Sequence, residues 1–101
     1  MARNYQDKDI KLLWGRSAAL CAFPLCRRRL VLDQTTVDPI ATIGAMAHIV
    51  AHSKELQAPR VDITFPDYLR DRYDNLILLC DNHHKMVDLQ PNTYTVDELR
   101  G

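Results

Sequence analysis

Two adjacent histidines, His83 and His84, stand three and four residues after Cys80 in the segment NLILLCDNHHKMVD, residues 75–88. Adjacent side chains on a helix point about 100° apart, so one metal ion rarely binds two neighbouring imidazoles. The pair therefore predicts two different tasks. The role of each histidine is inferred from the residues elsewhere in the chain that could act with it.

Four residues have the types and spacing of a structural zinc site. Four residues lie between Cys21 and Cys26, and two lie between Cys80 and His83. Two close pairs that are far apart in the sequence are typical of a zinc ion that joins two segments, and thiolate and imidazole are ligands that zinc prefers. Cys80 and His83 would share one helix face, and Pro24 favours the bend of a knuckle. The alternative is that these cysteines are small buried hydrophobic residues.

A second set of residues includes the remaining histidine of the pair. His48 lies in the short apolar segment AMAHIVA, where a lone histidine is more often a packed residue than a catalytic one. Asn75 precedes LILLC, and His84 follows the predicted zinc ligand His83. In chain order the three residues are His, Asn and His, and this order favours a catalytic role for His48 over simple packing.

These segments resemble the HNH endonuclease family, whose core is the ββα-metal motif. The matching stretches are LCAFPLCRRRLV, AHIVAHS and YDNLILLCDNHHKMVD, which cover roughly residues 20–88 in the family's order. The resemblance implies a small α+β domain in which two hairpin strands and a helix surround a structural zinc ion. It further implies that His48 is the general base, that Asn75 braces the loop between the strands, and that His84 binds a catalytic divalent ion.

This assignment is chemically coherent, with one departure from the family pattern. An imidazole that titrates near neutral pH can take a proton from water, and a cation beside the phosphate stabilises the developing charge. Many members carry an acidic or histidine ligand directly before the base, but this chain has Ala47 there. His84 is then the one firm ligand, and the ion could be Mg²⁺, Mn²⁺ or Ni²⁺. Asp88 could bind that ion or orient His84, or be a surface carboxylate. His52 is a further candidate, or else a loop histidine.

The charge is balanced overall but not along the chain. The 101 residues include 13 basic and 13 acidic side chains. Residues 1–33 hold seven basic and three acidic residues, a net charge of +4, and the remainder carries −4. The basic half could form a local face for an anion such as DNA. The candidate phosphate contacts, each with the alternative of an ordinary solvated charge, are Arg27, Arg28, Arg29, Arg60 and Lys85.

The apolar periodicity predicts a first helix over residues 5–21. Ile10, Leu13 and Trp14 form one apolar stripe at helical spacing, and Gly15 is expected to end or weaken the helix. A plain packing role accounts for this helix.

Further elements follow from alternation and from turn residues. Thr95 and Glu98 have capping-box spacing, so a helix should begin there. The other predicted elements are a strand over 29–33, a turn-rich stretch over 34–46, a strand running into a loop over 47–53, a long loop with one helical turn over 54–74, and an apolar-then-helical segment over 75–88. A loop this long in a small domain is functional or is held by something other than a core. The expected organisation is an N-terminal helix over 1–19, an HNH core over 20–90, and over 91–101 the start of a helix or a linker to a further domain.

These features favour a metal-dependent endonuclease that acts on DNA. Double-stranded DNA is implied by the family resemblance alone. One alternative is a zinc-knuckle module that binds nucleic acid or protein without cleaving it, but this leaves His48, Asn75 and His84 unexplained. The other alternative is a purely structural domain in which the histidines pack.

The cellular setting is inferred by analogy. Similar modules stand at the front of bacterial antiviral defence effectors of the CBASS type, in which a C-terminal sensor such as a SAVED domain binds cyclic nucleotides and triggers oligomerisation and cutting. A fused sensor domain and an oligomer on activation are therefore expected by analogy. The sequence shows no apolar stretch long enough for a membrane span and no signal peptide, and its three cysteines argue against a pure disulfide framework, so a cytoplasmic protein is expected.

Overall fold

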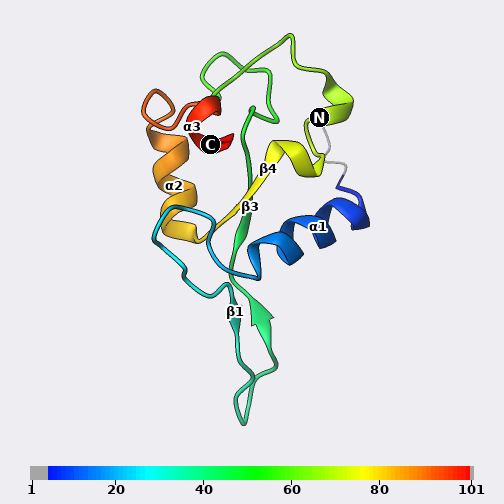
Figure 1. Ribbon diagram of the computed structural model, residues 1–101, viewed down its shortest axis with the longest axis vertical. Helices are drawn as coiled ribbons and strands as arrows, with labels where there is room; N and C mark the ends of the chain where they lie inside the picture. The colour runs from blue at the N-terminus through cyan, green and yellow to red at the C-terminus, as the bar shows by residue number, and fades with distance from the viewer. Residues whose placement is uncertain (1–4, 101) are drawn as a thin grey trace.

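The computed structural model describes residues 5–100, in which short strands and three α-helices are joined by long loops (Figure 1). The α-helices are α1 Asp7–Ser17, α2 Asp81–Leu89 and α3 Val96–Arg100, and the 3₁₀ turns are η1 Asp67–Leu69 and η2 Tyr73–Asn75. The strands are β1 Val31–Leu32, β2 Ala41–Thr42, β3 Ala45–His48 and β4 Leu76–Leu79. This small α+β arrangement is compatible with the predicted fold class.

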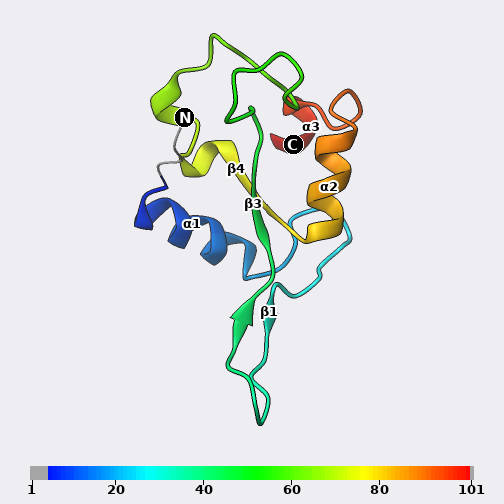
Figure 2. The same ribbon diagram turned by 180° about the vertical axis from the view of Figure 1, so that it is seen from behind.

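The antiparallel pair of β3 and β4 forms the centre of the domain. Ala47 pairs with Ile77, and His48 pairs with Leu76. Figures 1 and 2 show α1 and α2 on opposite sides of this pair. The core brings together the buried residues Leu13, Cys21, Leu30, Ala47, Leu76, Leu78, Leu79, Cys80 and Val87. Two cysteines of the predicted zinc site are therefore part of the core itself.

The first helix forms as the apolar stripe predicts, but it does not end at Gly15. Leu13 is buried and Trp14 packs against the core. The helix continues to Ser17, and Ala18 ends it with a left-handed φ of 54°. A methyl group added at Gly15 would have no atom within 4 Å, so this residue faces open space. An exposed glycine costs a helix about 1 kcal/mol relative to alanine, which tertiary packing can outweigh.

Two short strands form a hairpin that extends away from the rest of the domain (Figure 2). The strand predicted over 29–33 is present as β1, which pairs with β2. The turn-rich prediction for 34–46 missed β2 and the start of β3, because two-residue strands leave almost no periodic signal. At the base of the hairpin, Gly44 lies so close to Leu30 that an added Cβ would stand 2.9 Å from its Cδ1.

The long connection between β3 and β4 is held by polar contacts, as its sequence suggested. Arg70 is almost fully buried and donates to the carbonyl oxygens of Ala51 at 2.7 Å, Asp62 at 2.7 Å and Phe65 at 2.8 Å. Asp67 accepts a further bond from the same guanidinium at 3.1 Å. One arginine thus joins distant parts of a loop in which Leu56 and Ile63 stay exposed.

The C-terminal helix begins where the capping residues predict. α3 starts at Val96, and the backbone N–H of Glu98 donates to Oγ1 of Thr95 at 3.3 Å. This bond satisfies one of the amide groups that a helix leaves without an internal partner at its N-terminus.

Candidate active site and metal centre

The four predicted zinc ligands come together. Cys21 and Cys26 lie in the loop after α1, Cys80 is the residue directly before α2, and His83 is in the first turn of α2. Their ligand atoms all lie within 4.8 Å of one another. Nδ1 of His83 is 3.3 Å from Sγ of Cys80 and 3.6 Å from Sγ of Cys21. Three thiols and one imidazole around one point form a donor set that fits a tetrahedral zinc ion.

The loop that carries Cys21 and Cys26 is a strained knuckle. Leu25 has φ 66° and Arg27 has φ 54°, although neither is glycine. The N–H of Cys26 donates to the carbonyl of Phe23 at 3.1 Å, and the N–H of Cys21 donates to that of Arg28 at 2.9 Å. Left-handed backbone at ordinary residues persists only where its surroundings enforce it. A metal ion bound by both cysteines would supply such enforcement.

The thiols differ in acidity. Burial raises the pKa of Cys21 to about 11. Burial also acts to raise the pKa of Cys80, but hydrogen bonds from the backbone of His83 and from the thiols of Cys21 and Cys26 outweigh it, so this pKa lies below its usual value. Cys80 therefore loses its proton more readily than Cys21, and a thiolate is the form that binds zinc.

The second histidine of the pair faces a different region. His84 lines a pocket of about 200 Å³ together with His48, His52, Arg60 and Asp88. Nε2 of His84 lies 3.1 Å from Oδ2 of Asp88, and the other oxygen of Asp88 lies 3.0 Å from the guanidinium of Arg60. Arg60 partly offsets the charge of this carboxylate.

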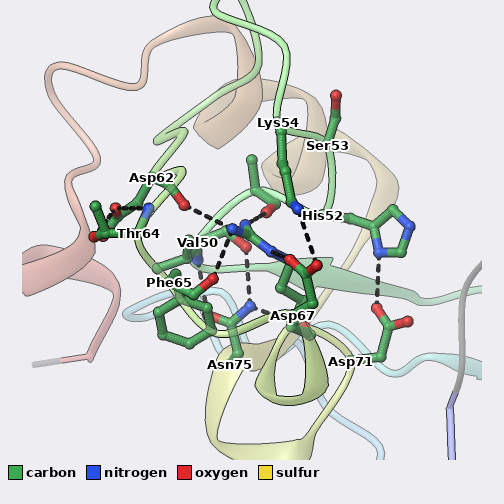
Figure 3. A network of polar contacts seen from close by, with 12 residues as sticks. Val50, His52, Ser53, Lys54, Asp62, Thr64, Phe65, Asp67, Asp71 and Asn75 are labelled. Atoms are coloured by element: carbon green, nitrogen blue, oxygen red, sulfur yellow. Dashed lines mark hydrogen bonds and ion pairs between the residues drawn. The ribbon is translucent and has the colours of Figure 1, made fainter. Parts of the chain in front are cut away.

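His48 stands at the end of β3, where its ring contacts a residue that the sequence analysis did not select. Nε2 of His48 lies 2.7 Å from Oδ1 of Asp71, and Nδ1 of His52 lies 3.0 Å from the same oxygen. Figure 3 shows His52 turned toward Asp71. Asp71 is buried in the connection before η2. Nothing in its local sequence distinguishes it from the other acidic residues of that loop, so only the tertiary structure could reveal it.

Asn75 has the geometry of the expected brace. Its Oδ1 accepts from the N–H of Val50 at 2.8 Å, and its Nδ2 donates to the carbonyl oxygens of Val50 and Arg70, both at 2.9 Å. The backbone carbonyl of Asn75 also accepts from the N–H of Ile49 at 2.9 Å. The buried side chain thus ties the residues directly after His48 to the end of the long loop (Figure 3).

Ala47 is buried on the core side of β3 and is only 1% exposed. Side chains alternate between the two faces of a strand, so residue 47 faces away from the side that His48 occupies. The site where many family members have a metal ligand is thus filled by core packing in this chain. His52 and Asp71 bring additional donor atoms to His48 from the loop instead.

The predicted phosphate-binding residues fall into two groups. Arg27, Arg28, Arg29 and Lys85 are exposed, and Arg29 pairs loosely with Asp33 at 3.2 Å. Arg60 is different, because its side chain is only 3% exposed. Its guanidinium donates to the carbonyl oxygens of His48, Ile49, Val87 and Tyr94. A phosphate contact from Arg60 would require several of these bonds to break, so its placement is that of an internal brace.

The comparisons with known proteins agree with this geometry. A family model described as HNH endonuclease matches residues 24–89, which is more than half of the chain and includes His48, Asn75 and His84. A search of curated proteins gives no match. Within residues 5–100, no helix combines the length and apolar character needed to cross a membrane. The matched segment and the site that it encloses show that this chain belongs to the HNH endonuclease family.

Proposed function

We propose that the chain is a metal-dependent endonuclease that hydrolyses DNA phosphodiester bonds. The observation that carries the proposal is the meeting of His48 and His84 at one pocket, although 35 intervening residues separate them. The two side chains come from β3 and from α2, the two kinds of element that the ββα-metal motif combines. The histidine pair and the family membership both support a nuclease acting on a nucleic acid.

In this mechanism His48 takes the proton of the attacking water. The carboxylate of Asp71, 2.7 Å from its ring, stabilises the imidazolium that forms. His84 would hold a divalent ion such as Mg²⁺, Mn²⁺ or Ni²⁺, and Asp88 would orient His84 or share the ion. When bound, the ion would stabilise the charge that develops on the phosphate and the leaving oxygen. Asn75 holds the backbone after His48 and so fixes the direction of its ring.

We also propose that the cluster of Cys21, Cys26, Cys80 and His83 binds a structural Zn²⁺ ion. Their convergence within 4.8 Å, the two buried thiols and the strained knuckle support this assignment. Zinc would join the loop after α1 to the start of α2. His83 would then serve folding while His84, its neighbour, serves the reaction.

The substrate is double-stranded DNA, by analogy with the family. Arg27, Arg28 and Arg29 on the knuckle and Lys85 beside His84 are exposed and would contact phosphates. Each such contact makes DNA binding weaker at high salt, because it releases condensed counterions. The basic residues Arg27, Arg28 and Arg29 in the first third of the chain would thus bind DNA, although the net charge of the whole chain is zero.

The family analogy also supports a place in a cytoplasmic antiviral defence effector. In that setting a fused sensor domain binds a cyclic oligonucleotide, and oligomerisation brings the nuclease modules onto DNA. Size-exclusion chromatography and cleavage assays of a longer protein, with and without cyclic oligonucleotides, test this role. A lack of response to all such ligands would contradict it.

Plasmid cleavage tests the nuclease assignment. The wild-type chain is freed of loosely bound ions with EDTA, supplied with Mg²⁺, Mn²⁺ or Ni²⁺, and compared with His48→Ala. Loss of a general base should lower the cleavage rate about 10²- to 10⁴-fold, with the fold and the zinc content retained. Asn82→Ala, an exposed change on α2, is the control and should cut normally. Binding of DNA without cleavage in every ion would favour the binding-module alternative.

A further inference from the structure

We propose that His48, His52 and Asp71 form a second metal site, which takes a transition-metal ion such as Zn²⁺ or Co²⁺ and thereby inactivates the base. The binding part of this inference stands on geometry alone. The inhibitory part rests on the proposed role of His48 as the base. Neither part involves the cysteine cluster, which shares no residue with this site.

Three donor atoms converge at one point in this part of the molecule. Two imidazoles approach the same oxygen of Asp71, at 2.7 Å from His48 and 3.0 Å from His52. The three ligand atoms lie within 4.8 Å of one another. Ligands about 2.0–2.2 Å from a tetrahedral ion stand roughly 3.3–3.5 Å apart. A shift of Asp71 by less than about 1 Å would therefore open the space that an ion needs.

The site is rigid and its side chains are largely shielded from water. The side chains of His48, His52 and Asp71 are 9%, 13% and 7% exposed. Arg70, the residue before Asp71, is anchored by carbonyl oxygens of the loop, and its own carbonyl accepts from Asn75. Donors held in this way need little reorganisation to bind an ion, which favours affinity. His48 and His52 also line the 200 Å³ pocket, which gives an ion a path from solvent.

The donor set selects among cations. Two imidazoles and one carboxylate in a tetrahedral arrangement suit Zn²⁺ or Co²⁺, whereas Ni²⁺ prefers square-planar or tetragonal geometry. Mg²⁺ requires oxygen ligands in near-octahedral geometry and gains little from imidazole. Mg²⁺ should therefore leave this site empty while it supports the reaction at the pocket of His84, where Asp88, water and the phosphate offer oxygen ligands. Zn²⁺ or Co²⁺ at low concentration should enter the site of His48, His52 and Asp71.

Occupation of this site would remove His48 from catalysis. An ion on Nε2 takes the electron pair of that nitrogen, so the one proton of the neutral ring stays on Nδ1 and no nitrogen remains free to accept a proton from water. The chain would cut DNA in Mg²⁺ and stop when Zn²⁺ or Co²⁺ is present in excess over the cysteine cluster. His52 would set the sensitivity, because it is the ligand that the hydrolytic mechanism does not use.

Calorimetric titration of the zinc-loaded chain with Co²⁺ tests the binding directly, without reference to cleavage. We expect one further ion per chain, with the weak visible bands of nitrogen and oxygen ligands and without sulfur charge-transfer bands. His52→Ala and Asp71→Asn should each weaken this event at least tenfold, and His84→Ala should leave it intact. Circular dichroism verifies that each variant is folded. If Asp71→Asn does not fold, His52→Ala alone decides the test. Absence of any further Co²⁺ binding to the zinc-loaded chain, or equal affinity in His52→Ala, would overturn the proposal.

Cleavage in Mg²⁺ with rising Zn²⁺ tests the consequence. The wild type should lose activity over the same concentration range in which the site fills, and His52→Ala should require at least tenfold more Zn²⁺ relative to its own uninhibited rate. Zinc binding at this site without inhibition would overturn the inhibitory part. If no variant cleaves DNA under any condition, the nuclease proposal fails while the calorimetric result still decides the site.

Discussion

The cysteine cluster and the histidine pocket are both built on α2, yet their properties are opposite. In the cluster, Cys21 and Cys80 are buried, and every donor is directed at one point. In the pocket, His84 and Asp88 are each 38% exposed at the side chain, and their polar atoms surround a space of about 200 Å³. The first arrangement suits an ion that never leaves, and the second suits a substrate that must come and go.

One step along a helix separates the two regions. His83 and His84 point about 100° apart, so one ring joins the cluster and the next joins the pocket. Phe23 stacks on His83 with ring centroids 4.0 Å apart and an angle of 1°, which fixes its direction. His84 has a carboxylate partner instead, at 3.1 Å. His83 thus belongs to the region that stabilises the fold, and His84 belongs to the region proposed to react. Mutation of one should affect stability, and mutation of the other should affect cleavage.

The largest effect should come from Cys80→Ser. Structural zinc in peptide sites contributes on the order of 10 kcal/mol, which is comparable to the whole free energy of unfolding of a small domain. We expect a variant without bound zinc and without a cooperative thermal transition. Serine nearly preserves the shape, and Asn82→Ala provides a matched change on the same helix. An unchanged melting temperature in Cys80→Ser would show that the cysteine cluster does not contribute to the stability of the fold.

A smaller loss of stability is expected from Asn75→Ala, on the pocket side. The change leaves the buried N–H and C=O of Val50 without their side-chain partner, at a cost of about 1–3 kcal/mol for each unsatisfied group. Chemical denaturation should show a lower free energy of unfolding, with zinc still bound. Cleavage should fall further than the loss of folded protein explains. A variant with wild-type cleavage would contradict the bracing role.

The arginines of the knuckle test whether the cluster also serves the substrate. Changing Arg27, Arg28 and Arg29 to alanine together should leave the melting temperature nearly unchanged, because all three are exposed. The slope of log K against log salt for DNA binding should fall by about one for each lost phosphate contact. Fluorescence anisotropy over a range of salt concentrations measures it. If the triple variant has the same slope as the wild type, the DNA does not contact these three arginines.

The smallest effect is expected from Phe23→Leu. Leucine retains an apolar side chain but removes the stacking on His83 and the edge contact with Tyr94 at 5.6 Å. Aromatic pairs contribute about 0.5–1.5 kcal/mol beyond their buried area. Thermal unfolding should show this loss, with zinc bound more weakly and the Mg²⁺ dependence of cleavage unchanged. A change in that dependence instead would link the two regions more closely than the structure suggests.

Sequence patterns predicted the parts of the site that depend on local spacing. The cysteine pairs, the His83–His84 step and the cap at Thr95 are each visible within a few residues, so their geometry follows from helix or turn rules. Asp71 and Arg60 could not be assigned in this way. Their partners lie 11–34 residues away in the sequence. A charged loop residue ordinarily faces solvent, and only the tertiary structure buries it.

The most direct test of the central claim compares His83→Ala with His84→Ala. Metal content by mass spectrometry, the melting temperature and plasmid cleavage in Mg²⁺ are measured on both chains. Our account predicts that His83→Ala loses tightly bound zinc and thermal stability. His84→Ala should keep both and lose cleavage alone. Loss of zinc in both variants, or full cleavage by His84→Ala, would contradict the separation of a structural ion from a catalytic one.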